Sequence, residues 1–142
     1  MQFPTPDQYQ SHRKPKAGAA RVLLVDEDFR DLQYYRSVLV ERGYDVHVLG
    51  SYEEAEHRLQ KESFDFVLVG QGTSAFEGRR VVERAIKVDR RTPVVVLARC
   101  LDIGCYLEAM QLGALDYLEK PLTSAEVSRV IDTHLRTPKM VV

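Results

Sequence analysis

The sequence has 142 residues, which is the usual length of one domain and leaves too little chain for two independent cores. Its 44% hydrophobic and 29% charged residues are typical of a globular protein and exclude a disordered or fibrous one. Twenty basic and twenty-one acidic residues give a net charge of −1, which argues against a non-specific binder of nucleic acid or membrane surfaces. Because the sequence has neither an apolar run of about 20 residues nor a hydrophobic signal segment, we expect a cytoplasmic protein without nucleic-acid or membrane partners.

Residues 1–20 are predicted to form an N-terminal tail outside the domain. They include Pro4, Pro6 and Pro15 and few apolar side chains, so they cannot bury enough surface to offset the entropy of ordering. A basic cluster at 12–16 could contact an acidic partner, although we expect it to be solvated. Residues 21–136 are predicted to form the domain, and 137–142 a C-terminal tail.

From residue 21 onward, apolar runs alternate with segments of helical period. The runs predict five strands, at 22–25, 46–49, 66–69, 94–97 and 115–118. Three of these runs are continuous and rich in β-branched residues, which is typical of buried parallel strands. This pattern predicts strands that are covered on both faces.

Helix signals separate the predicted strands. A stripe of apolar residues at 32, 35, 38 and 39 predicts a helix that ends at Gly43. Capping boxes at 51–54 and 123–126 open the second and fifth helices, while the apolar residues within 81–86 and 107–112 mark the third and fourth. The order is therefore (βα)₅: an α/β fold with a five-stranded parallel, doubly wound sheet, in which a ligand site lies at the carboxyl ends of the strands.

The cysteines and histidines indicate no metal or redox site. The spacing of Cys100 and Cys105 fits neither a zinc knuckle nor a redox CxxC motif, so we expect reduced thiols. The histidines are scattered without a helical ligand spacing; they are His12, His47, His57 and His134.

Charged residues follow the first and last predicted strands. Asp26, Glu27 and Asp28 come directly after the first strand, and Lys120 and Pro121 follow the fifth. Adjacent carboxylates repel one another, so they usually imply a cation or a lysine nearby. The fold would bring Lys120 across the end of the sheet to these acids.

With these motifs the chain resembles the receiver domain of bacterial two-component response regulators, over residues 21 to about 136. The resemblance implies the flavodoxin-like receiver fold. Its motifs are VLLVDED (22–28), the turn at 43–46, FDFVLV (64–69), TPVVVLA (92–98) and, most specific, GALDYLEKP (113–121). In that family an acid pair binds a divalent metal, an aspartate after the third strand accepts a phosphoryl group, and a lysine contacts that group. A hydroxyl after the fourth strand and an aromatic side chain before the lysine relay the change.

Some of the family's functional residues have matching residues in this sequence, and others do not. Asp26 and Glu27 match the acid pair, Lys120 the lysine and Tyr117 the aromatic relay. The acceptor position holds Gly70, which has no side chain to phosphorylate. In addition, Ala98 stands where the switch hydroxyl is expected, and Ser74 where the family has a proline.

The resemblance therefore implies a degenerate receiver without the acceptor aspartate, acting as a protein-interaction module and not as an enzyme. With carboxylates from one loop only, plus the backbone of Gly72, magnesium binding is expected to be weak if it occurs, so no cofactor is expected. Lys120 is instead expected to pair with Asp26 or Glu27. Two alternatives stay open: phosphorylation of Thr73, Ser74 or Glu77, and anion binding by the backbone N–H groups of residues 70–74.

Two surfaces could bind partners such as a histidine kinase, another regulator or a second copy of the chain. One is the fourth helix with the fifth strand and helix, where Tyr106, Met110 and Tyr117 are the expected contact residues. The other is a basic stretch at 79–91, which a solvated helix face would also explain. Too few residues follow Leu135 for a DNA-binding helix-turn-helix, so we expect no output domain here, although a longer parent protein stays possible.

Overall fold

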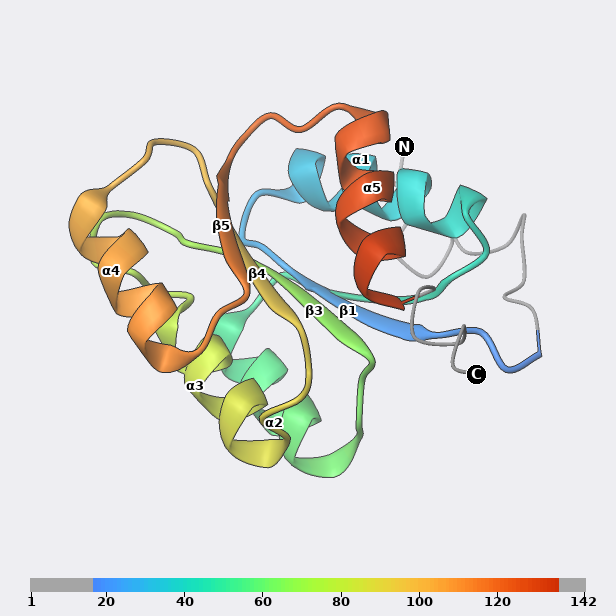
Figure 1. The fold of residues 1–142 in the computed structure, drawn as a ribbon, viewed down its shortest axis with the longest axis horizontal. Coiled ribbons are helices and arrows are strands. Elements are labelled where there is room, and N and C mark those ends of the chain that lie inside the picture. Colours follow the sequence, from blue (N-terminus) through green and yellow to red (C-terminus); the bar gives the residue numbers. More distant parts are fainter. Residues whose placement is uncertain (1–16, 136–142) are drawn as a thin grey trace, which may run out of the picture.

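The computed structural model describes residues 17–135; the predicted tails lie almost entirely outside this range. Five parallel strands form one sheet in the order β2-β1-β3-β4-β5 (Figure 1). The strands are β1 (Arg21–Val25), β2 (Asp45–Leu49), β3 (Phe66–Gly70), β4 (Val94–Ala98) and β5 (Asp116–Glu119). The predicted fold class is confirmed, and each strand lies within one residue of its expected position.

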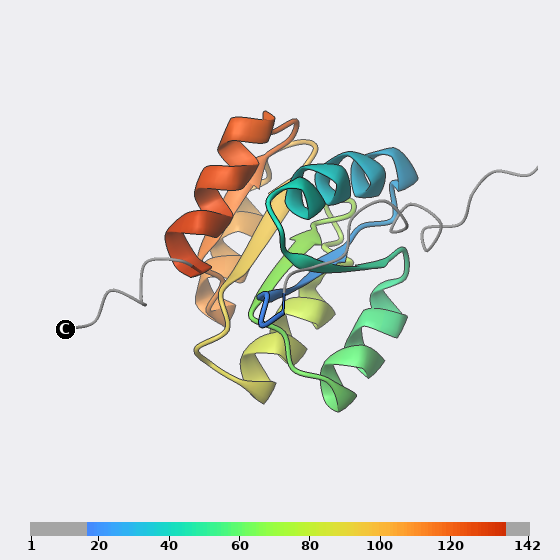
Figure 2. The same cartoon turned by 90° about the vertical axis from the view of Figure 1, so that its right-hand side faces the viewer.

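Five helices cover the two faces of the sheet. They are α1 (Phe29–Glu41), α2 (Tyr52–Lys61), α3 (Arg79–Val88), α4 (Ile103–Leu112) and α5 (Ser124–Leu135). Figure 2 shows α1 and α5 together above the sheet, with α2 and α3 on the opposite face. In Figure 1, α4 lies on the same side as α3. The sheet is therefore the middle of three layers.

The continuous apolar runs are explained by burial on both sides of the sheet. Side chains of a strand point alternately to opposite faces, so Leu23 and Val25 enter one core and Val22 and Leu24 enter the other. The first core lies under α2, α3 and α4, and the second lies under α1 and α5.

The predicted helix boundaries have the expected local chemistry. Gly43 follows α1 with a φ of 92°, a conformation that favours glycine. At α5, the Thr123 backbone N–H donates to the Glu126 carboxylate (2.8 Å) and the Glu126 N–H donates to the Thr123 hydroxyl (3.1 Å). This reciprocal capping box satisfies two N–H groups that the helix itself leaves unpaired.

The two cysteines are free thiols, as the sequence predicts. Cys100 follows β4 and is exposed, whereas Cys105 is buried on α4. Burial raises the pKa of the Cys105 thiol to about 11, so this group is protonated at neutral pH. Within residues 17–135, no helix is long and apolar enough to cross a bilayer.

Candidate functional site

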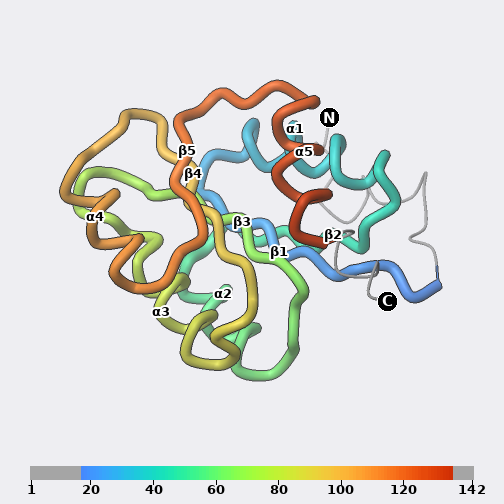
Figure 3. Tube along the Cα trace, in the orientation of Figure 1, coloured from blue at the N-terminus to red at the C-terminus, as the bar shows by residue number. Residues whose placement is uncertain are grey.

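The carboxyl ends of the strands surround a cavity of about 570 Å³. Figure 3 traces the loops after β1, β3, β4 and β5 as they leave the sheet at this same end. The lining residues come from the loops after these four strands and from the end of β4: Asp26, Glu27, Asp28, Gln71, Gly72, Thr73, Ser74, Leu97, Arg99, Cys100, Leu101, Asp102 and Lys120. The cavity therefore lies where the strand order predicts a site.

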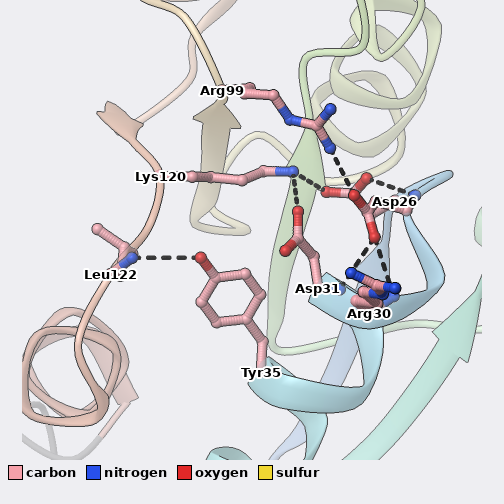
Figure 4. A network of polar contacts seen from close by, with 8 residues as sticks. Asp26, Arg30, Asp31, Tyr35, Arg99, Lys120 and Leu122 are labelled. Atoms are coloured by element: carbon pink, nitrogen blue, oxygen red, sulfur yellow. Dashed lines mark hydrogen bonds and ion pairs between the residues drawn. The ribbon is translucent and has the colours of Figure 1, made fainter.

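Lys120 joins the loop after β5 to the acids beside β1. Its ammonium Nζ lies 2.6 Å from Asp26 Oδ2 and 2.7 Å from Asp31 Oδ2 (Figure 4). The side chains of Lys120 and Asp26 are 9% and 6% exposed. Burial alone lowers the pKa of a lysine, but the bonds to both aspartates outweigh it and raise the pKa of Lys120. The expected pairing of Lys120 with Asp26 is present, and its second partner is Asp31 and not Glu27.

Asp28 is the N-cap of α1. Its carboxylate accepts hydrogen bonds from the backbone N–H groups of Arg30 (2.9 Å) and Asp31 (3.3 Å), and it forms an ion pair with Arg99. Partial burial raises the pKa of Asp28, but these N–H groups and Arg99 leave it below the ordinary value. One member of the acidic run therefore serves to start a helix.

Gly70 ends β3 in direct contact with Asp26. A Cβ atom added to Gly70 would lie 2.5 Å from Asp26 Oδ2 and 2.8 Å from Asp26 Cγ, well inside van der Waals contact. The Asp26 carboxylate thus fills the volume in which a side chain at the end of β3 would begin.

The Glu77 carboxylate contacts the loop that follows β3. Its carboxylate accepts hydrogen bonds from the backbone N–H (2.7 Å) and the hydroxyl of Thr73. It also lies 2.3 Å from the position of a Cβ on Gly72, whose φ is +87°. Both the conformation and the close approach require glycine at position 72.

Tyr117 is buried and its hydroxyl is fully engaged. The hydroxyl donates to Gln71 Oε1 and accepts from the Asp102 backbone N–H (3.0 Å). The Tyr106 ring packs edge-on against Tyr117, with centroids 5.7 Å apart. Tyr117 is only 7% exposed, so its expected place on an exposed contact face is wrong: it lies beneath Tyr106, because its hydroxyl has partners inside the domain.

The surface of α4 carries exposed apolar side chains. Tyr106 and Met110, the other two expected contact residues, are among them. The remaining ones on α4 and the loops beside it are Leu101, Ile103, Leu107 and Leu115. Large apolar side chains gathered on one face often mark a protein-binding surface.

The basic stretch on α3 is partly neutralised by neighbouring helices. Arg79 forms an ion pair with Glu108 of α4 (2.7 Å), and Arg80 with the nearly buried Glu56 of α2 (3.0 Å). Two of its cations therefore contribute to helix packing.

Most of the acids beside β1 have partners within the domain. Asp26 Oδ2 is bonded to Lys120, Asp26 Oδ1 accepts the Asp28 N–H (2.9 Å), and Asp28 is the cap of α1. Of the three consecutive acids, only Glu27 has a carboxylate that forms no hydrogen bond or ion pair with another of residues 17–135. Residues 17–135 contain no group of three His, Cys, Asp or Glu side chains placed to hold a metal, whereas octahedral Mg²⁺ needs several oxygen ligands at once.

Sequence reasoning located Asp26, Gly70, Ala98, Tyr117 and Lys120 at this end of the sheet, and the structure brings them together. It missed Asp31, Gln71 and Arg99. Asp31 lies one helical turn beyond the acidic run, on the side of α1 that faces Lys120 (Figure 4). Gln71 directly follows β3, and a position directly after a strand of a parallel sheet indicates a residue near the site.

The fold and this site define a class of protein. The family model of the response regulator receiver domain matches residues 22–132, and the chain belongs to that family of signalling modules.

Similar proteins support this assignment. The chain is 28% identical to the transcriptional regulatory protein ZraR of Escherichia coli K12 over 101 residues, 71% of this chain and 23% of that protein. It is 32% identical to the alginate biosynthesis regulator AlgB of Pseudomonas aeruginosa, again over 71% of this chain and 22% of that protein. The chain thus spans less than a quarter of the length of these relatives. Because both are named as transcriptional regulators, the expected absence of a nucleic-acid partner stays a prediction.

Solved structures show the same fold. A CheY-like receiver domain protein from Methanospirillum hungatei JF-1 superposes with a TM-score of 0.76 at 22% identity, over 81% of this chain and 92% of that one. A response regulator from Burkholderia pseudomallei, described with a phosphorylated aspartic acid and a calcium ion, gives 0.71 at 21% identity, over 84% of this chain and 69% of that one.

Proposed function

We propose that this chain is a receiver domain that accepts no phosphoryl group and acts as a constitutive protein-interaction module in cytoplasmic signalling. The observation that carries the proposal is Gly70 at the end of β3, with the Asp26 carboxylate filling the space of its missing side chain. A glycine offers no atom that could form an acyl phosphate. A relative of the same fold is described with a phosphorylated aspartic acid, so the fold itself is compatible with the chemistry that this chain has lost.

The surrounding residues support the same proposal. Lys120, the family's phosphoryl-contacting lysine, is already neutralised by Asp26 and Asp31. Ala98 ends β4 without a hydroxyl group. Because Lys120 neutralises Asp26 and Asp31 and Arg99 pairs with Asp28, Glu27 is the one acid of the 26–28 run without a cation among residues 17–135, and we expect weak Mg²⁺ binding at most.

Two other chemistries are less well supported. Thr73 Oγ1 is hydrogen-bonded to both oxygens of Glu77 (3.0 and 2.9 Å), which occupies two of the three candidate acceptors and leaves Ser74 as the third. The cavity carries four carboxylates, those of Asp26, Glu27, Asp28 and Asp102, against the cations Arg99 and Lys120. This charge balance disfavours a small anion.

The test is incubation with Mg²⁺ and acetyl phosphate, followed by intact-mass spectrometry. We expect the unmodified mass throughout, because the acceptor carboxylate is absent. A receiver domain with its acceptor aspartate, treated in parallel, must show the adduct. A stoichiometric phosphoryl adduct on this chain would overturn the proposal, and peptide mapping to Thr73, Ser74 or Glu77 would establish a substitute acceptor.

The interaction surface that we propose is α4 with the adjoining β5 and α5, and the partners are other signalling proteins, such as a histidine kinase or regulator, or a second copy of the chain. It is supported by the exposed apolar side chains of α4, of which Ile103 is 76% exposed. We infer that binding and not catalysis is the activity, since Lys120 and Asp26 are held in an ion pair and Asp28 serves as the cap of α1.

A further inference from the structure

Gln71 is buried where the loop after β3 meets β5 and the start of α4. We propose that Gln71 is a positioning residue that holds Tyr117 inward and thereby keeps the first turn of α4 in one arrangement without phosphorylation. This inference rests on the proposed function, because it names how a non-accepting receiver keeps its α4 surface in a fixed state.

Every polar group of Gln71 has a partner in the domain. The backbone N–H donates to Leu97 O (2.7 Å), and the backbone oxygen accepts from the Gly78 N–H (3.0 Å). The side-chain Nε2 donates to Thr73 O (3.1 Å), which leaves Oε1 pointing to the hydroxyl of Tyr117. With only 3% of its surface exposed, the Gln71 amide has little freedom to rotate, so its acceptor is preorganised.

Tyr117 joins Gln71 to the start of α4. Its hydroxyl donates to Gln71 Oε1 and accepts the backbone N–H of Asp102 at 3.0 Å. If Tyr117 rotated outward, a buried amide oxygen and a backbone N–H would both lose their partner. Leaving buried polar groups unpaired is costly, so the inward rotamer is strongly favoured.

Asp102 in turn is the N-cap of α4. Its Oδ1 accepts the Cys105 N–H (2.9 Å) and its backbone oxygen accepts the Tyr106 N–H (2.8 Å). The bond from Tyr117 therefore ends on the residue that begins the helix bearing the exposed apolar side chains. Through these contacts, Gln71 acts on the position of α4.

The residue at the end of β4 cannot compete for Tyr117. Ala98 has no hydroxyl, so no group there could attract or release the Tyr117 hydroxyl in a second state. A ligand shifts a conformational equilibrium only through different affinity for two states. The contacts of Tyr117 with Gln71 and Asp102 stabilise the inward position of its side chain, and no group at the end of β4 stabilises a second position.

The experiment measures the χ1 rotamer of Tyr117 by three-bond couplings in isotope-labelled protein, together with hydrogen exchange at the Asp102 amide. The wild type is expected to show one rotamer. In Gln71→Ala, and in Gln71→Met, which keeps the side-chain volume, we expect a second rotamer and exchange at Asp102 faster by about tenfold. Gln60→Ala, an exposed glutamine of α2, is the matched control and is expected to leave both measurements unchanged.

A single rotamer and wild-type exchange in Gln71→Met would overturn the inference. Repeating the wild-type measurement with Mg²⁺ and acetyl phosphate separates the two proposals. If an adduct forms while the untreated protein shows one Gln71-dependent rotamer, the proposed function fails and the role of Gln71 in the resting state stands. If no adduct forms but the untreated protein shows two rotamers, the role of Gln71 fails and the proposed function stands.

Discussion

Asp26 and Gly70 lie in contact at the carboxyl edge of the sheet. Asp26 is buried, ion-paired with Lys120 and placed against the backbone of Gly70. The space beside Gly70 is therefore filled by Asp26. A new side chain at position 70 has to displace a carboxylate that is already bonded to its partners.

We predict that Gly70→Ala destabilises the protein by about 1–3 kcal/mol, the usual cost of overpacking. Replacing a glycine inside a strand by alanine normally stabilises a protein by about 0.5–1 kcal/mol. The change in stability that we expect for Gly70→Ala therefore has the opposite sign. The reason is that the new Cβ would lie 2.5 Å from Asp26 Oδ2 and would push Asp26 away from Lys120. Urea denaturation at neutral pH measures the change.

Gly50→Ala is the matched control for this substitution. A Cβ at Gly50 meets no atom closer than 3.9 Å, which is ordinary contact, so its free energy of unfolding should not decrease. If Gly50→Ala and Gly70→Ala changed the free energy of unfolding equally, Asp26 would be able to move away from the new Cβ without a cost in free energy, which would contradict the prediction.

At the scale of elements, α4 differs from the other helices in the side chains that it exposes. α3 has a polar outer face, partly neutralised by Glu56 and Glu108, whereas α4 exposes Ile103, Tyr106 and Leu107 to solvent. Its inner side, with Cys105 and Ala109, is buried at the same time. A helix that is apolar on both sides requires either a deeper core or a partner.

We predict that the double substitution Tyr106→Glu and Met110→Glu abolishes partner binding or self-association and leaves the fold intact. Both side chains are exposed, so the new charges cost little in the free domain but are desolvated at an interface. Sedimentation velocity and pull-down with a candidate signalling partner measure binding, and circular dichroism checks the fold.

Arg84→Glu with Lys87→Glu on α3 is the control pair, because this face belongs to the basic stretch. We expect binding to persist in it. Loss of binding in the α3 pair, together with full binding in the α4 pair, would transfer the interaction surface to α3.

At the scale of the whole molecule, Lys120 connects segments far apart in the sequence. It follows the edge strand β5 and reaches Asp26, directly after the inner strand β1, and Asp31 on α1 (Figure 4). Since the sheet order places β3 and β4 between β1 and β5, this pair of bonds spans the carboxyl edge of the sheet.

We predict that Lys120→Met lowers the free energy of unfolding near neutral pH by about 3 kcal/mol, because it leaves two carboxylates without their buried cation. Lys87→Met, at an exposed position, is the control and should change stability little. The double variant with Asp26→Asn is expected to recover part of the loss, which a double-mutant cycle measures.

The pH dependence of this effect has a definite sign. Because the folded-state pKa of Lys120 is raised, its stabilising contribution is fully present below the unfolded pKa of about 10.4. It is lost as the pH rises through the folded pKa. The difference between wild type and Lys120→Met should therefore be constant from about pH 7 to 9 and shrink at higher pH; a difference that peaks in alkali would contradict this assignment.

Much of the architecture follows from local patterns. Buried runs such as 66–69 and 94–97 predict strands because side chains on both faces of a parallel sheet must be apolar. The capping box at Thr123 and Glu126 predicts the start of α5 because those side chains satisfy neighbouring N–H groups. The convergence of Asp26 and Lys120 follows in turn from the order of strands and helices.

The sequence by itself determined the fold, the edge of the sheet that carries the site and the absence of a side chain at Gly70. Only the tertiary structure decided that Asp31 shares Lys120, that Asp26 fills the space beside Gly70, and that Tyr117 is turned inward to Gln71. Secondary structure follows from periodicity along the chain. The partner of a charged or hydroxyl group depends on which side chains from distant segments of the chain lie within hydrogen-bond distance of it. The spacing of residues in the sequence does not specify those distances.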